Sequence, residues 1–338
     1  MSAATISEQV TPRALQAVAG QRRTMLDVGR LAAVYAIIWI HAPQLPALEQ
    51  SKALSRFAVP YFVMVTIFLA FEGIARNPQR SWRQYVSSRF ARLYLPLLGW
   101  SAIYLAFKAV KGWALPNEPN DYPGVELLWA GSCYHLWFLP FILAVSVLAM
   151  AIAKWVAGRP AVAPAMFAVA LVAGAVAAIA PISFAVPDSY LELIVNALPA
   201  VGWGIALAVA CRLLGTGALE RPGVALAGGL LAVASIAWVW DFGRDRLVEN
   251  VAGLGVLLVT LAPVSDARWS RLGRWGPLSL GIYTSHVLWI KILQVATTKA
   301  GFSGSWQRDA TVFVVSAALS TLTAWTLSRW RWTRWLVA

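Results

Sequence analysis

The chain of 338 residues is poor in charge, and poorest in negative charge. Asp, Glu, Lys and Arg together make up 13% of it, whereas 59% of the residues are hydrophobic. A soluble domain cannot bury that much apolar surface in its own core, and long stretches with almost no charge recur along the whole length. Short segments of alternating polarity, the signature of a membrane β-barrel, do not occur. The composition therefore predicts an α-helical membrane protein.

Cysteine and histidine are also scarce. Cys133 and Cys211 are predicted near opposite membrane faces, so we expect no disulfide between them. The three histidines, His41, His135 and His286, have no acidic residue deep in the same spans, and we expect no metal site. The formal charge of +13 does not indicate nucleic acid binding, because the basic residues lie in short loops between apolar runs.

Ten apolar runs are long enough to cross a membrane, which predicts an all-α polytopic protein with about ten transmembrane helices. The first run follows two dozen polar residues without a cleavage site, so we expect a retained helix rather than a signal peptide. We expect a cytoplasmic segment (1–26), one transmembrane domain (27–330) and a cytoplasmic tail (331–338). The predicted spans are 27–45, 56–75, 93–110, 135–156, 161–181, 190–213, 223–241, 249–264, 277–297 and 310–330.

The distribution of Lys and Arg predicts the orientation. With both termini in the cytoplasm, the inner segments carry 18 basic residues and the outer segments carry 8, among them Lys52, Arg56 and Arg308. Basic residues are enriched in cytoplasmic loops, so both termini are predicted to be cytoplasmic.

Three ionisable residues interrupt the first apolar run, LDVGRLAAVYAIIWIHA. His41 follows Arg30 by 11 residues, which is about 20° past three full helical turns and about 16 Å along the axis. Asp27 precedes Arg30 by three residues, within ion-pairing reach on the same face. A snorkelling arginine and a packing histidine would explain two of these residues singly. A stripe of all three favours function, because ionisable groups within a membrane are costly.

Further polar side chains gather on a later helix and before an earlier one. Ser279, Tyr283 and His286 fall at i, i+4 and i+7, which is one helical face. Arg89 and Arg92 precede the third predicted span and suit a phosphate-rich ligand, since arginine binds phosphate through two parallel hydrogen bonds. Positive-inside anchoring is the alternative explanation for this pair.

His135 opens the fourth predicted span, in CYHLWFLP. Its neighbours Tyr134 and Trp137 leave open that it simply belongs to an aromatic belt at the membrane interface.

Taken together, these motifs resemble those of the acyltransferase-3 family of integral membrane acyltransferases, over nearly the whole chain and in the same order. The segment VPYFVMVTIF (59–68) is also similar to the second span of that family. The matching residues are Asp27, Arg30 and His41 in the first span; Arg89 and Arg92, followed by Pro96; HLWFL at 135–139; and Ser279, Tyr283 and His286.

Leu31 stands where many family members have glycine, and Thr66-Ile67 stand where many have Ser-Gly. The resemblance therefore points away from branches that acylate macrolides or carry a fused esterase-like domain. It points toward the O-acetyltransferases of surface polysaccharides and of enterobacterial-antigen-like glycans, in the bacterial inner membrane. No further domain follows the last span in this sequence, so we expect direct delivery of the acyl group to the acceptor.

The resemblance implies a mechanism, with no permanently bound cofactor. Cytoplasmic acetyl-CoA would bind through its phosphates to Arg89 and Arg92, and its thioester arm would run past Arg30. His41 would act as general base on a hydroxyl of a polysaccharide or lipid-linked sugar, for which an imidazole is suited. The remaining matched residues would bind substrate, orienting the acceptor or holding the thioester carbonyl: His135, Ser279, Tyr283 and His286. Direct transfer is the favoured version, and a transient acyl-histidine is the alternative, which the sequence does not separate from it.

Two other classes of function are considered. A secondary transporter would use intramembrane polar residues as a substrate or proton path, but no acidic residue lies mid-span and no internal repeat is visible. A non-catalytic partner of a polysaccharide-export complex would tolerate loss of His41. Acetyl transfer by an enzyme is the function that the sequence favours.

Overall fold

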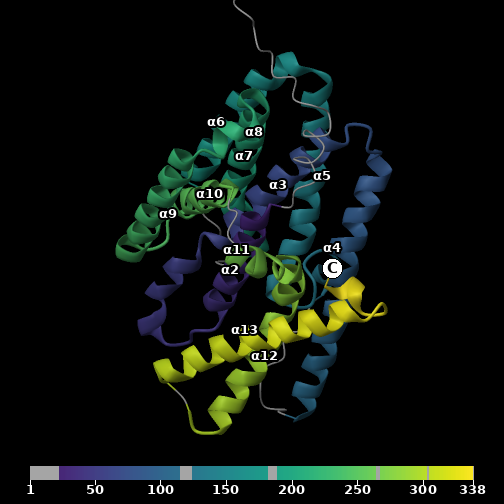
Figure 1. The fold of residues 1–338 in the computed structure, drawn as a ribbon. Helices are drawn as coiled ribbons and strands as arrows, with labels where there is room; N and C mark the ends of the chain where they lie inside the picture. The colour runs from purple at the N-terminus through teal and green to yellow at the C-terminus, as the bar shows by residue number, and fades with distance from the viewer. Residues whose placement is uncertain (1–22, 115–123, 182–188, 264–266, 303, 338) are drawn as a thin grey trace, which may run out of the picture.

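The computed structural model describes residues 23–114, 124–181, 189–263, 267–302 and 304–337, and its regular secondary structure in these ranges is entirely helical (Figure 1). Residues 1–22 of the predicted N-terminal segment lie outside the described part. The helices of 16 residues or more are α2 (Thr24–His41), α3 (Ala58–Arg76), α4 (Trp82–Ala114), α5 (Phe138–Gly158), α6 (Ala163–Ile179), α7 (Tyr190–Leu214), α9 (Pro222–Phe242), α10 (Arg246–Leu261), α12 (Ser279–Lys299) and α13 (Trp306–Arg329).

Short helices connect these long ones. They are η1 (Pro46–Leu48), η2 (Gln50–Ser55), η3 (Val125–Leu128), η4 (Tyr134–Trp137), η5 (Pro160–Val162), α8 (Thr216–Leu219), α11 (Ala267–Gly273), η6 (Gly276–Leu278) and η7 (Arg334–Leu336). Six of the long helices carry a proline, and in two of them, α6 and α9, it stands at the very start of the helix. Pro60 in α3 and Pro140 in α5 lie in the first turn, where the missing N–H matters little. Pro96 in α4 and Pro199 in α7 lie in the helix interior.

Each of the ten predicted spans corresponds to one long helix, so the predicted fold class is confirmed. Within the described ranges, nine helical stretches are long and apolar enough to cross a membrane, and α10, with 16 residues, is shorter. Several helix ends differ from the prediction, and two of these differences concern predicted site residues. Helix α2 ends at His41 instead of continuing to residue 45, and α4 begins at Trp82, so that Arg89 and Arg92 lie on the helix itself.

Helices α2 and α12 run parallel. Arg30 of α2 contacts Ser279 of α12, and further along both helices the ring of His41 lies on that of His286. Seven long helices separate α2 from α12 along the chain, provided that α10 is counted. Because parallel spans require an odd number of crossings between them, α10 acts as a crossing despite its length.

Helix α2 lies centrally, with α6, α7 and α9 to one side of it and α12 and α13 to the other (Figure 1). The most apolar 18-residue windows of α3 and α7 are each 61% buried, whereas those of α6, α9 and α13 are 22% buried. An apolar helix that exposes most of its side chains meets lipid in a membrane. The polar stripe of α2 is thus enclosed by other helices, and the peripheral helices carry the lipid-facing surface.

Glycines bring the peripheral helices close to their neighbours. A Cβ added to Gly202 of α7 would lie 2.6 Å from the backbone of Gly174 in α6, and one added to Gly255 of α10 would lie 2.5 Å from the carbonyl oxygen of Gly228 in α9. Any larger side chain would push these helices apart. Close backbone approach of this kind is how membrane helices gain packing energy.

Candidate active site

The stripe of α2 forms the ion pair that its spacing predicts. Arg30 Nη1 donates to Asp27 Oδ1 at 3.2 Å, and Arg30 Nη2 donates to Ser279 Oγ at 3.1 Å. Asp27 is buried, and a Cβ added to Gly276 would lie 2.6 Å from its carbonyl oxygen. The start of α2 is therefore packed tightly against the turn that leads into α12, and Arg30 joins the two helices.

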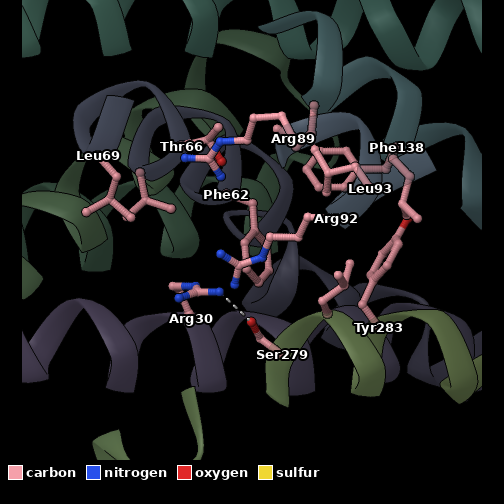
Figure 2. Close-up of a pocket in the computed structure, with 14 residues that line it drawn as sticks. Arg30, Phe62, Thr66, Leu69, Arg89, Arg92, Leu93, Phe138, Ser279 and Tyr283 are labelled. Carbon is pink, nitrogen blue, oxygen red and sulfur yellow. Dashed lines mark hydrogen bonds between the residues drawn. The ribbon is translucent and has the colours of Figure 1, made fainter. Parts of the chain in front are cut away.

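A pocket opens beside this contact (Figure 2). Its cavity volume is about 170 Å³, and the cavity is open at its mouth. Arg30, Arg89, Arg92, Ser279 and Tyr283 supply its polar lining, and α3, α4, α5 and α12 supply apolar side chains. The pocket thus gathers five of the predicted site residues from three helices.

The pocket is electropositive. Figure 2 shows the guanidinium groups of Arg30 and Arg92 turned toward the same space, with Arg89 beside Thr66. In the part of the chain that the structure describes, no carboxylate lies in ion-pair contact with Arg89 or Arg92, while Arg30 is paired with Asp27. Two uncompensated positive charges beside an apolar wall favour an anionic ligand with an apolar arm.

The three histidines form a cluster at the other end of the stripe. The ring centroids of His41 and His286 are 5.4 Å apart with an interplanar angle of 29°, and those of His135 and His286 are 4.9 Å apart. His41 is half-buried, while His135 and His286 are 2% and 0% exposed. Tyr134 packs edge-on against His41 at 5.2 Å. One residue from α2, one from η4 and one from α12 thus meet in an aromatic, water-poor environment.

Hydrogen bonds set the direction of two of these rings. His286 Nδ1 contacts the carbonyl oxygen of Tyr283, and His135 Nε2 lies 3.4 Å from that of Thr284. A carbonyl oxygen only accepts, so in the neutral ring each of these nitrogens carries the proton. The other nitrogens, His286 Nε2 and His135 Nδ1, are buried and have no hydrogen-bond partner among the described residues. Two buried lone pairs are therefore available to a hydroxyl donor.

Tyr283 stands between the pocket and the histidine cluster. It lines the pocket, and its ring centroid lies 5.6 Å from that of His135 and 5.7 Å from that of His286. Its hydroxyl donates to the carbonyl oxygen of His135. Among the described residues, the pocket lining reaches Tyr283 but includes none of the three histidines.

The acyltransferase-3 family model, described as an acyltransferase domain, matches residues 24–329 of this chain. The chain belongs to the acyltransferase-3 family. It is accordingly an acyltransferase integral to a membrane. No curated protein and no solved structure is found to match it.

The match supports the transfer of an acyl group as the general activity of this acyltransferase-3 protein. All nine predicted site residues belong to the two connected groups. Asp27, Arg30, Arg89, Arg92 and Ser279 surround the arginine end of the pocket; His41, His135 and His286 form the cluster; Tyr283 contacts both. Their individual roles are taken up in the next subsection.

Tyr104 of α4 also contacts the histidine cluster, and the sequence does not predict this. Its hydroxyl donates to the Thr284 carbonyl oxygen at 2.9 Å and accepts from the Leu288 N–H at 3.1 Å. A regular helix joins that N–H and that carbonyl directly. Tyr104 is thus inserted into the backbone of α12 next to His286, and its ring packs against His135 at 5.4 Å. A single tyrosine in an apolar run carries no pattern that would single it out.

Cys133 lies directly before Tyr134 and His135 and is partly buried. Burial raises the pKa of its thiol to about 11. At neutral pH the thiol therefore stays protonated, and a protonated thiol is a weak nucleophile. Cys133 is therefore a poor candidate for carrying the acyl group.

Proposed function

We propose that this protein is a membrane O-acetyltransferase that moves an acetyl group from acetyl-CoA to a sugar hydroxyl of a surface polysaccharide or of its lipid-linked precursor. The observation that carries the proposal is the connection of a cationic pocket, through one tyrosine, to a cluster of three histidines. A phosphorylated acyl donor and a proton-accepting centre need these two environments side by side.

The donor is assigned to the arginine end. Acetyl-CoA carries several phosphate charges at one end and a long, mostly uncharged arm at the other. Arg89 and Arg92 supply donors for the phosphates, and the apolar walls from α3 and α5 suit the arm. Arg30, held by Asp27 and Ser279, faces the same space. With the predicted orientation, this end of the pocket opens toward the cytoplasm, where acetyl-CoA is made.

The chemistry is assigned to the histidine end. The hydroxyl oxygen of the acceptor attacks the thioester carbonyl, and His41 takes the hydroxyl proton as general base. The carbon–sulfur bond breaks, and coenzyme A leaves as a thiolate that recovers the proton from His41. The lone pairs of His135 Nδ1 and His286 Nε2 accept hydrogen bonds from acceptor hydroxyls and so orient the sugar.

Direct transfer requires the thioester to pass Tyr283, because the pocket lining ends there. The alternative, a transient acyl-histidine, would place the acetyl group on the cluster before the acceptor arrives. Rapid mixing with labelled acetyl-CoA in the absence of acceptor distinguishes the two, since only the second leaves a labelled histidine.

The proposal is tested on the surface glycan of a deletion strain. We expect NMR to show loss of O-acetyl signals, which return when the wild-type gene is supplied and not when an equally expressed His41→Ala variant is supplied. The purified protein in proteoliposomes should also consume acetyl-CoA when the acceptor glycan is added. Unchanged glycan acetylation on deletion, or uptake of a solute without acetyl-CoA consumption, would favour a transporter and reject the proposal.

A further inference from the structure

A pair of buried charged residues lies outside the pocket and the histidine cluster. Arg308 and Asp309, in the first turn of α13, are 8% and 1% exposed, and Arg308 Nη1 lies 3.6 Å from Asp309 Oδ1. The last predicted span begins at residue 310, whereas α13 begins at Trp306, so both residues lie on the helix. Burying two charges is costly unless each finds partners, so their contacts show what they hold together.

Asp309 holds the chain that follows His41. Its Oδ2 atom accepts hydrogen bonds from the backbone N–H of Gln44 at 2.9 Å and of Leu45 at 3.0 Å. Helix α2 ends at His41, so the chain beyond it is fixed by such contacts and no longer by the helix. A carboxylate that accepts two backbone N–H groups is a strong, directional contact. It fixes the course of the chain three residues beyond the proposed base.

Arg308 ties the same segment to the end of α12, the helix that carries His286. Its Nη1 atom donates to Gln44 Oε1 at 2.6 Å. Its Nε and Nη2 atoms donate to the hydroxyls of Thr297 and Thr298, both at 3.1 Å, and Nη2 also donates to the carbonyl oxygen of Gln294 at 3.3 Å. One side chain thus contacts the continuation of α2 and the last turns of α12.

Through the segment after α2, these contacts add a polar connection between α2 and α12. The hydrogen bond from Arg30 to Ser279 is another. His41 and His286 lie between the two connections along their helices and stack on one another. We propose that Arg308 and Asp309 are positioning residues, which set the axial register of α2 against α12 and thereby hold His41 over His286. This inference rests on the proposed function, which gives His41 its role as base.

The register matters because a helix rises only about 1.5 Å per residue. A slide of about 1 Å between α2 and α12 would move the proton-accepting nitrogen relative to the acceptor, and a misplacement of that size can cost about 100-fold in rate. The donor pocket lies at the opposite end of α2, where the hydrogen bond from Arg30 to Ser279 still joins the two helices, so the displacement is expected at the His41 end. Loss of the connection through Arg308 and Asp309 is therefore expected to lower kcat and to leave the KM for acetyl-CoA unchanged.

The experiment compares Asp309→Ala, Asp309→Asn and Gln44→Ala with a matched control, Ser305→Ala. The Ser305 hydroxyl accepts from the Arg308 N–H and caps the same helix, so the control weakens α13 without removing the contacts to the 44–45 segment. The full-length proteins in proteoliposomes are measured for kcat and for the KM for acetyl-CoA. The rate at which diethyl pyrocarbonate modifies His41 is followed by mass spectrometry, which needs no turnover.

For Asp309→Ala we expect kcat to fall about 100-fold at unchanged KM, with faster modification of His41. Asp309→Asn keeps an acceptor oxygen and should fall between this variant and the wild type, and Ser305→Ala should resemble the wild type. If Asp309→Ala does not fold, Gln44→Ala decides, with a smaller change in the same direction. The proposal is overturned if Asp309→Ala behaves like Ser305→Ala, or if KM rises instead.

If the wild type transfers no acetyl group from acetyl-CoA, the proposed function fails. The His41 modification rate then decides separately whether Asp309 positions that residue: a rate equal to that of Ser305→Ala rejects the positioning role, and a faster one supports it.

Discussion

The two ends of the α2 stripe differ in charge, in exposure and in the hydrogen-bond partners of their side chains. At the arginine end, Arg89 and Arg92 face an open pocket and have no carboxylate partner among the described residues. At the histidine end, His135 and His286 are almost fully buried among aromatic rings, and two of their nitrogens lack a partner among the same residues. The first end is open and positively charged, and the second is enclosed by aromatic rings.

This contrast favours binding of the acyl donor at the arginine end and the acyl-transfer step at the histidine end. Exposed cations attract a multiply charged ligand and can release it again, because water screens the interaction. Buried, uncompensated lone pairs in a water-poor site strengthen any hydrogen bond that a substrate brings and keep water from competing for the acyl group. If the division is correct, substitutions at the two ends should change different kinetic constants.

The largest effect is expected from His41→Ala. General base catalysis contributes about 10²–10⁴-fold, so kcat for acetyl transfer should fall by that factor while the KM for acetyl-CoA stays unchanged. Steady-state kinetics in proteoliposomes measure both constants. Tyr134→Phe is the matched control, since it keeps the ring that packs against His41 and removes only a hydroxyl. A normal kcat in His41→Ala would show that His41 is a packing residue. The chemical step could then not be assigned to the histidine end.

The sequence predicts the two ends unequally well. Helical periodicity places Asp27, Arg30 and His41 on one face of the first span, and the Asp27–Arg30 ion pair confirms that geometry. It also places Ser279, Tyr283 and His286 on one face of α12, and that face lies against α2. Spacing within one helix is a local property, so it can be predicted from a single sequence.

Contacts between helices are not local, and there the sequence analysis falls short. It does not predict that Tyr104 enters the backbone of α12 or that Asp309 holds the chain after His41, because both contacts depend on tertiary packing. The early start of α4 at Trp82 is missed for another reason: the polar residues before Leu93 resemble a loop by hydropathy. In the structure these residues are helical, so α4 is longer than the apolar part of its sequence.

The second effect is expected at the arginine end. A charge-assisted hydrogen bond contributes about 1.5 kcal/mol or more, so Arg92→Ala should raise the KM for acetyl-CoA about tenfold and leave kcat nearly unchanged. The difference from the wild type should shrink as salt is added. Arg83→Ala is the control, because Arg83 is exposed on the same helix and lies outside the pocket lining. An equal rise in KM for both variants would indicate anchoring at the membrane surface in place of donor binding.

An intermediate effect is expected where the two ends meet. Tyr283→Phe keeps the ring that contacts both histidines and removes the hydrogen bond to the His135 carbonyl oxygen. One such bond contributes about 1 kcal/mol, so kcat should fall about fivefold at constant KM. Tyr94→Phe removes a comparable bond, to the Leu128 carbonyl oxygen, away from the site and should change neither constant. If only KM rises in Tyr283→Phe, this residue belongs to the donor end alone.

The smallest effect is expected from Ser279→Ala. The Ser279 hydroxyl accepts one hydrogen bond from Arg30, whose guanidinium keeps its ion pair with Asp27 when the hydroxyl is removed. Loss of about 0.5 kcal/mol would change the KM for acetyl-CoA about twofold and leave kcat unaltered, since the histidine cluster is held from the far end of α2. Ser285→Ala is the matched control, because its hydroxyl bonds only to carbonyl oxygens of its own helix. A larger fall in kcat than in affinity for Ser279→Ala would show that the two ends of α2 are coupled through the Arg30–Ser279 contact, and the separation of binding from chemistry would then have to be given up.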